Sequence, residues 1–189
     1  MQDLHETERK RVAINVRPAR QVDAQAIARL HYQMWRATYR RLAPESACRT
    51  LTEQVRLSRW QDMLARETRG RSILVAEVDG NLAGFGFAGA ASHAIFQNRA
   101  EVKFLYVGTD YKRMGIGRIL LVKLARDMVD FGYSGMALGV VIGNDPAIGF
   151  YEAMGGRRVG HYTDPGPVWR SENFVYVWDD LRALLALET

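Results

Sequence analysis

The sequence predicts an α/β domain with a mixed, mostly antiparallel central sheet flanked by helices. Two segments with strand-like composition, 72–78 and 82–90, are joined by an Asp-Gly-Asn turn at 79–81, which is typical of a hairpin. Residues 136–142 are almost all apolar, as expected of a strand covered on both faces. A segment with helical spacing starts at 116, between strand-like segments, and predicts a strand–helix–strand crossover.

The N-terminal part predicts one strand and two helices. Residues 13–17 alternate enough for a short strand that Pro18 ends. Apolar residues, with one threonine, then recur at three- and four-residue intervals in two segments: Ile27, Leu30, Met34 and Thr38 in the first, and Leu57, Trp60 and Leu64 in the second. Gly70 is a plausible end for the second helix.

The C-terminal part predicts three more strands and one more helix besides those already given. Residues 101–107 have strand composition, and the helix that starts at 116 ends at Gly132. An Asn-Asp-Pro sequence at 144–146 combines a capping side chain with a proline suited to a first helical turn. The last two strands are expected at 157–163 and 173–178.

Length and composition favour one folded domain. The chain has 189 residues, of which 48% are hydrophobic, and this suits a single core. We expect a flexible tail at 1–11 and a single domain at 12–189. Apolar runs fall short of the roughly 18 residues that a membrane span needs. The charged N-terminus lacks a secretory signal, and the single cysteine, Cys48, cannot form an intrachain disulfide, so a cytoplasmic location is expected.

The net charge of +5 favours an anionic partner without identifying it. The arginines are spread along the chain, and we expect most of them on solvated helix faces. The four histidines show no metal-ligand spacing, so we predict no metal site. Without a helix-turn-helix pattern or a basic–aromatic stacking motif, we also predict no nucleic-acid partner.

The most informative segment is 107–121, where a strand leads through a glycine-bearing loop into a helix. Free N–H groups at a helix N-terminus favour anions, and glycine lets the backbone approach a phosphate closely. Lys112, Arg113 and Arg118 add positive charge. A dinucleotide-binding motif would need a third glycine at position 120, where this chain has Leu120. A P-loop would need Gly-Lys followed by Ser or Thr, and this sequence is absent from the segment. A diphosphate site and a helix that merely starts after a turn both remain open.

The run EVKFLYVGTDYKRMGIGRILL at 101–121 resembles the central motif of the GNAT superfamily of acyl-CoA-dependent N-acetyltransferases. That motif reads Gln/Arg-x-x-Gly-x-Gly/Ala, and Gly115 and Gly117 match it while Lys112 replaces the first residue. A second family element, Asn-x-x-Ala-x-x-Phe-Tyr-Glu, follows at 144–152. The order of elements agrees with the family from residue 13 to about 178.

The resemblance implies transfer of an acetyl group from acetyl-CoA, as cosubstrate, to an amine that attacks the thioester directly. It implies that Glu101 acts as the base and Tyr151 as the acid that protonates the thiolate. A solvent-facing carboxylate and a core aromatic are the respective alternatives. Residues expected to bind the coenzyme are Tyr106, Val107, Lys112, Arg113, Met114, Gly115, Ile116, Gly117, Arg118 and Asn144. Asn144 is equally suited to capping the next helix.

The acceptor is left open by the sequence. A small-molecule amine and a peptide or protein amine both fit, and four aromatic residues could line the acceptor site or belong to the core: Trp35, Tyr39, Trp60 and Trp169. A protein of this fold that only binds acyl-CoA, as a sensor, is the main alternative to an enzyme. Relatives often form dimers, so a homodimer is also open. No membrane partner is expected.

Overall fold

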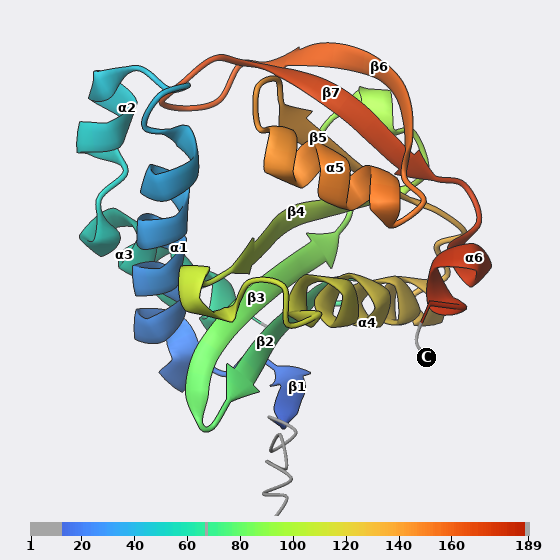
Figure 1. Cartoon of the computed structure of the whole chain (residues 1–189), viewed down its shortest axis with the longest axis horizontal. Helices are drawn as coiled ribbons and strands as arrows, with labels where there is room; N and C mark the ends of the chain where they lie inside the picture. The colour runs from blue at the N-terminus through green and yellow to red at the C-terminus, as the bar shows by residue number, and fades with distance from the viewer. Residues whose placement is uncertain (1–12, 67, 188–189) are drawn as a thin grey trace, which may run out of the picture.

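The computed structural model describes residues 13–66 and 68–187. Its centre is a seven-stranded sheet with the order β1-β2-β3-β4-β5-β7-β6, in which only β4 and β5 run parallel (Figure 1). The predicted fold class, a mixed and mostly antiparallel sheet flanked by helices, is confirmed. The tail expected at 1–11 lies outside the described residues.

The strands are β1 (Ile14–Pro18), β2 (Ser72–Val78), β3 (Asn81–Gly89), β4 (Ala100–Val107), β5 (Met136–Val141), β6 (Arg157–Asp164) and β7 (Ser171–Trp178). The helices are α1 (Ala24–Tyr39), α2 (Glu45–Thr50), α3 (Glu53–Ala65), α4 (Ile116–Asp130), α5 (Asp145–Ala153) and α6 (Leu181–Leu185). Short 3-10 turns are η1 (Gln21–Asp23), η2 (Ala94–Phe96) and η3 (Thr109–Tyr111). Each predicted strand and helix is present. The sequence analysis missed α2 and α6, which are too short to show a periodic pattern.

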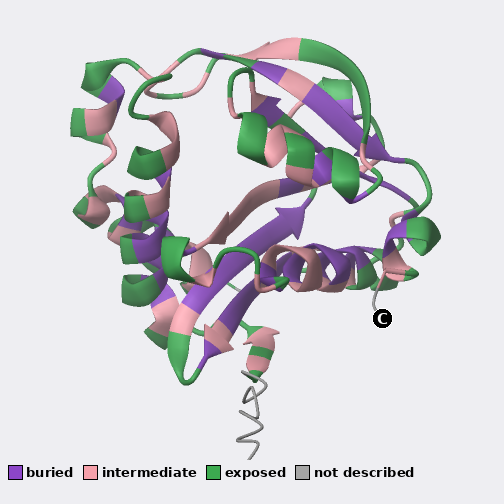
Figure 2. Cartoon of the chain, in the orientation of Figure 1, coloured by how far each residue is buried: buried purple, intermediate pink, exposed green. Residues whose placement is uncertain are grey.

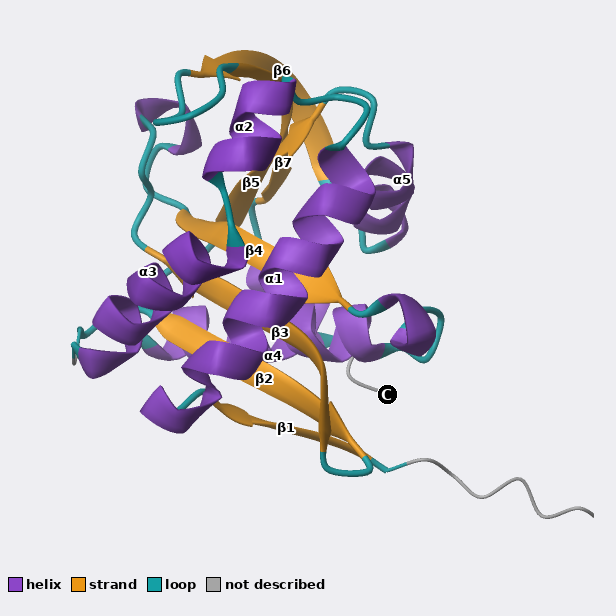
Figure 3. Cartoon of the chain, turned by 90° about the vertical axis from the view of Figure 1, so that its left-hand side faces the viewer, coloured by secondary structure: helices purple, strands orange, loops and turns teal. Residues whose placement is uncertain are grey.

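Helices cover both faces of the β1–β4 part of the sheet. Figure 3 shows α1 and α3 in front of these strands and α4 behind them. The α1–α3 side has its own hydrophobic cluster, which includes Ile27, Trp60 and Phe85. The α4 side belongs to the larger core, and Figure 2 shows buried residues along the central strands and the inner face of α4. A Cβ at Gly86 of β3 would lie only 2.8 Å from Leu124 Cδ1, so α4 packs unusually close to the sheet.

The sheet opens between β4 and β5. Their ladder consists of Ala100 with Met136 and Glu101 with Ala137, after which the two strands diverge (Figure 1). Lys103 is an extra residue in β4, because Val102 pairs with Ala88 and Phe104 pairs with Phe87. Such a bulge bends a strand and increases its twist. Beyond the ladder, β5 stays paired with β7 as far as Val141, so the sheet splits into two parts.

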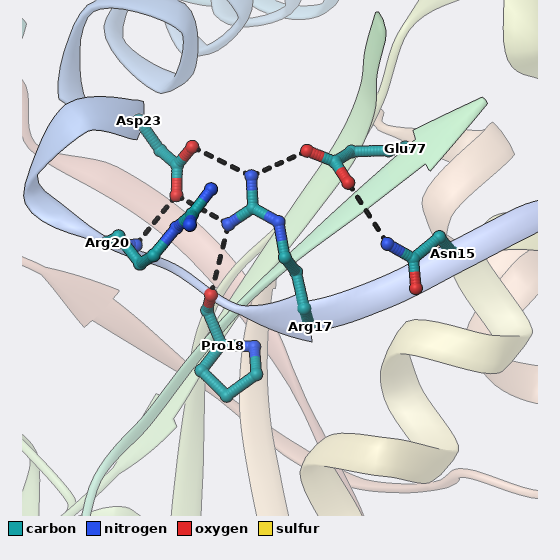
Figure 4. Close-up of polar contacts among 6 residues, drawn as sticks. All are labelled: Asn15, Arg17, Pro18, Arg20, Asp23 and Glu77. Carbon is teal, nitrogen blue, oxygen red and sulfur yellow. Dashed lines mark hydrogen bonds and ion pairs between the residues drawn. The ribbon is translucent and has the colours of Figure 1, made fainter. Parts of the chain in front are cut away.

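The first strand is tied to its neighbours by Arg17 (Figure 4). Its guanidinium donates to both carboxylate oxygens of Asp23, at 2.7 and 2.9 Å, and to Glu77 of β2 at 2.5 Å. Asn15 donates to the other oxygen of Glu77 at 3.1 Å. Hydrogen bonds from Arg17 lower the pKa of both carboxyl groups. This network fixes β1 on the edge of the sheet and the entry into α1.

Candidate active site

A cavity of about 500 Å³ lies where β4 and β5 diverge. Its walls come from α1, β4, the loop before α4, the first turn of α4, β5 and α5. It brings together ten of the predicted site residues: Tyr106, Val107, Lys112, Arg113, Gly115, Ile116, Gly117, Arg118, Asn144 and Tyr151. Met114 is instead packed against the hydrophobic core. The side chains and backbone of this cavity can hold an elongated ligand with one anionic end at α4.

The loop into α4 has the geometry of an anion site. Gly115, the residue before the helix, has φ +83°, and Arg113 has φ +63°. The first hydrogen bond of α4 runs from the Ile119 N–H to the Gly115 carbonyl, so the earlier N–H groups point out of the helix end. A Cβ on Gly117 would lie 3.3 Å from the Phe150 ring, so a larger residue would fill the space beside the helix end. These features fit a diphosphate held by backbone N–H groups.

The charged side chains of the loop divide into two groups. Lys112 and Arg113 are exposed at the cavity edge. Arg118 also lines the cavity, but its guanidinium donates to the Leu187 carbonyl, with Nε at 2.9 Å. The loop itself therefore offers two cations, and Arg118 binds the C-terminal segment.

The free edge of β4 offers backbone groups to the cavity. The Gly108 N–H donates to the Ala83 carbonyl of the β3 side at 2.8 Å. Since N–H directions alternate along a strand, the Val107 N–H points to the opposite edge, from which β5 has diverged. The Val107 N–H is therefore a backbone donor on the side of β4 that faces the cavity.

Tyr151 enters the cavity from α5. Its side chain is buried, and its ring packs edge-on against Phe150 and Trp178, with centroids 5.2 and 6.1 Å away. Burial, with a smaller contribution from Tyr39, raises the pKa of the Tyr151 hydroxyl. The hydroxyl is therefore protonated at neutral pH and can donate a proton.

Tyr39, Tyr106 and Asn144 form a hydrogen-bonded group that the sequence analysis did not foresee. The Tyr39 hydroxyl interacts with the Tyr106 hydroxyl and the Asn144 side chain, and both interactions lower the pKa of Tyr39 against the larger effect of burial. Burial raises the pKa of both tyrosines. Asn144 makes no side-chain cap to α5, and its backbone carbonyl accepts the N–H groups of Ala147 and Ile148. No local pattern could reveal this group, because its members come from α1, β4 and the loop before α5.

Glu101 lies in a second cavity, of about 320 Å³, instead of the first. One oxygen of its carboxylate accepts from the Ser92 N–H at 2.7 Å, the Ser92 hydroxyl at 2.6 Å and the Lys103 ammonium at 2.7 Å. The two cavities meet at the divergence of β4 and β5, where they share Tyr39, Val102, Lys103, Phe104, Tyr106 and Gly139. Glu101 and Tyr151 therefore line different cavities that have one wall in common.

The second cavity has largely aromatic walls. The four aromatic residues left open by the sequence, Trp35, Tyr39, Trp60 and Trp169, all line it. Trp35, Tyr39 and Trp169 contact one another, with ring centroids 5.4 to 6.2 Å apart. Arg56 of α3 also lines this cavity and is buried, whereas the sequence analysis expected most arginines on solvated faces. Its guanidinium contacts His31 and Trp35 of α1.

Two further observations concern metals and membranes. Among the described residues, no group of three or more His, Cys, Asp or Glu side chains is placed to hold a metal ion. Within residues 13–66 and 68–187, no helix has the length and apolarity of a bilayer crossing.

Comparison with known proteins gives concordant matches. The model of the acetyltransferase (GNAT) family matches residues 28–156. An uncharacterized N-acetyltransferase of Bacillus subtilis, YuaI, is 29% identical over 175 residues, which cover 92% of this chain and 98% of YuaI. Phosphinothricin N-acetyltransferase of Streptomyces viridochromogenes is 27% identical over 148 residues, which cover 77% of this chain and 75% of that protein.

Solved structures share the fold. PaiA N-acetyltransferase from Thermoplasma acidophilum, in complex with coenzyme A, has a TM-score of 0.68 and 20% identity, and covers 87% of this chain and 98% of its own. YncA, a putative acetyltransferase from Salmonella typhimurium with acetyl-CoA, has a TM-score of 0.66 and 24% identity, and covers 89% of this chain and 95% of its own. At these identities the likeness shows the fold.

Proposed function

The chain belongs to the GNAT family of acetyltransferases, and from this we propose that it transfers an acetyl group from acetyl-CoA to a primary amine by direct attack on the thioester. The observation that carries the proposal is the meeting of two cavities at the divergence of β4 and β5. One has an anion site and a buried tyrosine, and the other has a carboxylate and aromatic walls. Acetyl-CoA and the amine can therefore enter from different sides of the protein and meet where the two cavities join.

The larger cavity suits the coenzyme. The N–H groups at the start of α4 would hold the diphosphate, assisted by Lys112 and Arg113. The free edge of β4 would bind the pantetheine arm, and the Val107 N–H would stabilise the negative charge that develops on the thioester oxygen. Asn144 would act near this arm through its bond to Tyr39.

Proton transfer is assigned to Glu101 and Tyr151. An amine at neutral pH is mostly protonated and must lose a proton before it can attack. Glu101, in the second cavity, is the proposed base, acting directly or through water. The departing thiolate needs a proton, and the buried Tyr151 hydroxyl is the proposed donor.

An amine acceptor is supported by the relatives that are named N-acetyltransferases, one of them for phosphinothricin. The test is amine-dependent release of the CoA thiol from acetyl-CoA, with the acetylated amine identified by mass spectrometry. Acetyl-CoA binding without thiol release over a broad amine panel would favour a binding protein.

A further inference from the structure

Arg56 is a buried cation that forms no ion pair with any of the described residues. Arg56 is only 6% exposed, and its Nε and Nη2 atoms are buried with no hydrogen-bond partner in the described part of the chain. Its remaining nitrogen, Nη1, lies 2.7 Å from His31 Nε2. The guanidinium carbon lies 5.4 Å from the centroid of the Trp35 ring. Burying a charge is costly unless acceptors compensate for the lost water, so this arrangement needs an explanation.

His31 cannot supply the missing acceptors. Burial, followed by the charges of Arg56 and Arg59, lowers the pKa of His31, so the ring is neutral. A neutral imidazole has one acceptor nitrogen. Two donors approach it, however: Arg56 at Nε2, and the Trp60 Nε1–H at Nδ1, 3.2 Å away. Only one of these contacts can be a hydrogen bond, so the cluster has more donors than acceptors.

The carboxylates of the second cavity are already engaged. Glu101 binds Ser92 and Lys103. Asp164 accepts from the Gly166 N–H at 2.9 Å and lies 3.8 Å from His93. Arg59 also lines this cavity and adds positive charge near Arg56. The α3 wall is therefore cationic and short of acceptors.

We propose that the amine acceptor carries an anionic group, a carboxylate or a phosphorus oxyanion, which the guanidinium of Arg56 binds at the wall of the second cavity. The amine would then lie toward Glu101 and the junction with the larger cavity. A volume of about 320 Å³ is small for a ligand pocket, which favours a small amino-acid-like acceptor. The aromatic walls favour an apolar body between its two ends. This assignment rests on the proposed function of the same site.

The test compares matched ligands that lack the amine. We expect the protein to bind 3-phenylpropionate at least about tenfold more tightly than 3-phenylpropionamide, since hydrogen bonds to charged groups are the strong ones. Arg56→Met should abolish this preference. Arg29→Met removes a charge whose side chain is 65% exposed on the adjacent helix and should keep the preference. (2-Phenylethyl)phosphonate, as a third ligand, shows which anion is preferred.

Calorimetry measures the binding of these ligands with and without saturating CoA, and so tests the anion site separately from the proposed acetyltransferase function. Failure of acetyl-CoA to bind would overturn the proposed function, whereas the carboxylate preference can still be scored without coenzyme. Equal binding of carboxylate and amide, no binding of either, or an unchanged preference in Arg56→Met would overturn the anion site. Thermal unfolding and acetyl-CoA binding check that the variant is folded, and Arg56→Lys, which keeps the charge, should retain part of the preference.

Turnover provides the second readout. With acetyl-CoA saturating, kcat/KM should be higher for L-phenylalanine than for 2-phenylethylamine, and for L-leucine than for 3-methylbutylamine. Arg56→Met should lower kcat/KM for the amino acids about 10-fold or more, and by a larger factor than it lowers kcat/KM for the simple amines. A preference for the simple amines in the unmodified protein would overturn the proposal.

Discussion

At the scale of single residues, the proposed chemistry depends on a tyrosine that stays protonated. Tyr151 is buried, and burial raises the pKa of its hydroxyl. A group with a raised pKa is a weaker acid, but it remains a proton donor across the physiological pH range. The basic thiolate that forms beside it would accept this proton or a strong hydrogen bond.

We predict that Tyr151→Phe lowers kcat by about 100-fold or more, the usual size of a general-acid contribution. Acetyl-CoA affinity should change little, because the ring and its packing remain. Tyr133→Phe, which removes a hydroxyl from a residue outside both cavities, should leave kcat unchanged. Steady-state kinetics and calorimetry measure the two quantities. Equal kcat for Tyr151→Phe and the unmodified protein would remove Tyr151 from the reaction.

Gly117 tests the anion site. A Cβ there already lies 3.3 Å from the Phe150 ring, so Gly117→Leu should occupy the space beside the start of α4. We predict that acetyl-CoA affinity falls about 10-fold or more, since several N–H contacts to the diphosphate would be lost. Gly149→Ala is the control, because a Cβ at Gly149 meets nothing within 4 Å. Unchanged affinity in Gly117→Leu would refute the loop as the coenzyme site.

Whether a site residue could be predicted from the sequence depends on whether the residues that it contacts lie near it in the chain. Gly115, Gly117 and Tyr151 belong to local motifs, and the structure brings them to one cavity. The bond between Tyr39 and Asn144 joins distant elements, so no spacing could indicate it. Arg56 is one of many arginines in the sequence, and its burial depends on how α3 packs against α1.

At the scale of elements, the Arg17 network connects β1, η1 and β2 (Figure 4). Arg17 holds the pKa of Asp23 and of Glu77 below their ordinary values. A lowered pKa stabilises the folded state above the pKa that the group has when unfolded. That contribution is lost as the pH falls through the lowered folded value.

We predict that Arg17→Met lowers the free energy of unfolding at pH 7 by about 1–2 kcal/mol, because the network is only partly buried. The difference in the free energy of unfolding between Arg17→Met and the unmodified protein should have its full size above about pH 5. It should shrink below about pH 4, near the ordinary carboxyl pKa. Urea unfolding at several pH values measures it. A difference that stays constant down to pH 2 would show that the carboxylates are not responsible.

Elements differed in how well the sequence predicted them. The long helices α1, α3 and α4 have regular apolar spacing, and the β2–β3 hairpin has a clear turn, so each was predicted. The helices α2 and α6 span six and five residues, too few for a periodic signal. The bulge at Lys103 lies in a continuous strand-like run without glycine or proline, so no residue marks it.

At the scale of the whole molecule, the function depends on an interrupted sheet. β5 pairs with β7 along its length but with β4 only at its start, so the two parts of the sheet diverge (Figure 1). The divergence exposes backbone groups of β4 and leaves two neighbouring cavities that share one wall. The order of strands and helices was predictable from sequence. The second cavity was not, because its walls come from α1, α3, β4, β5, β6, β7 and the 164–171 segment.

Amine-dependent release of the CoA thiol is the direct measurement of acetyl transfer by this protein. Acetyl-CoA is incubated with the protein and the matched amino acids and amines, and the thiol and the acetylated product are quantified together. We expect equal amounts of thiol and N-acetyl product, with initial rates that Tyr151→Phe and Glu101→Gln both lower. Acetyl-CoA that binds but releases no thiol with any amine would contradict this expectation and leave the fold as a binding protein.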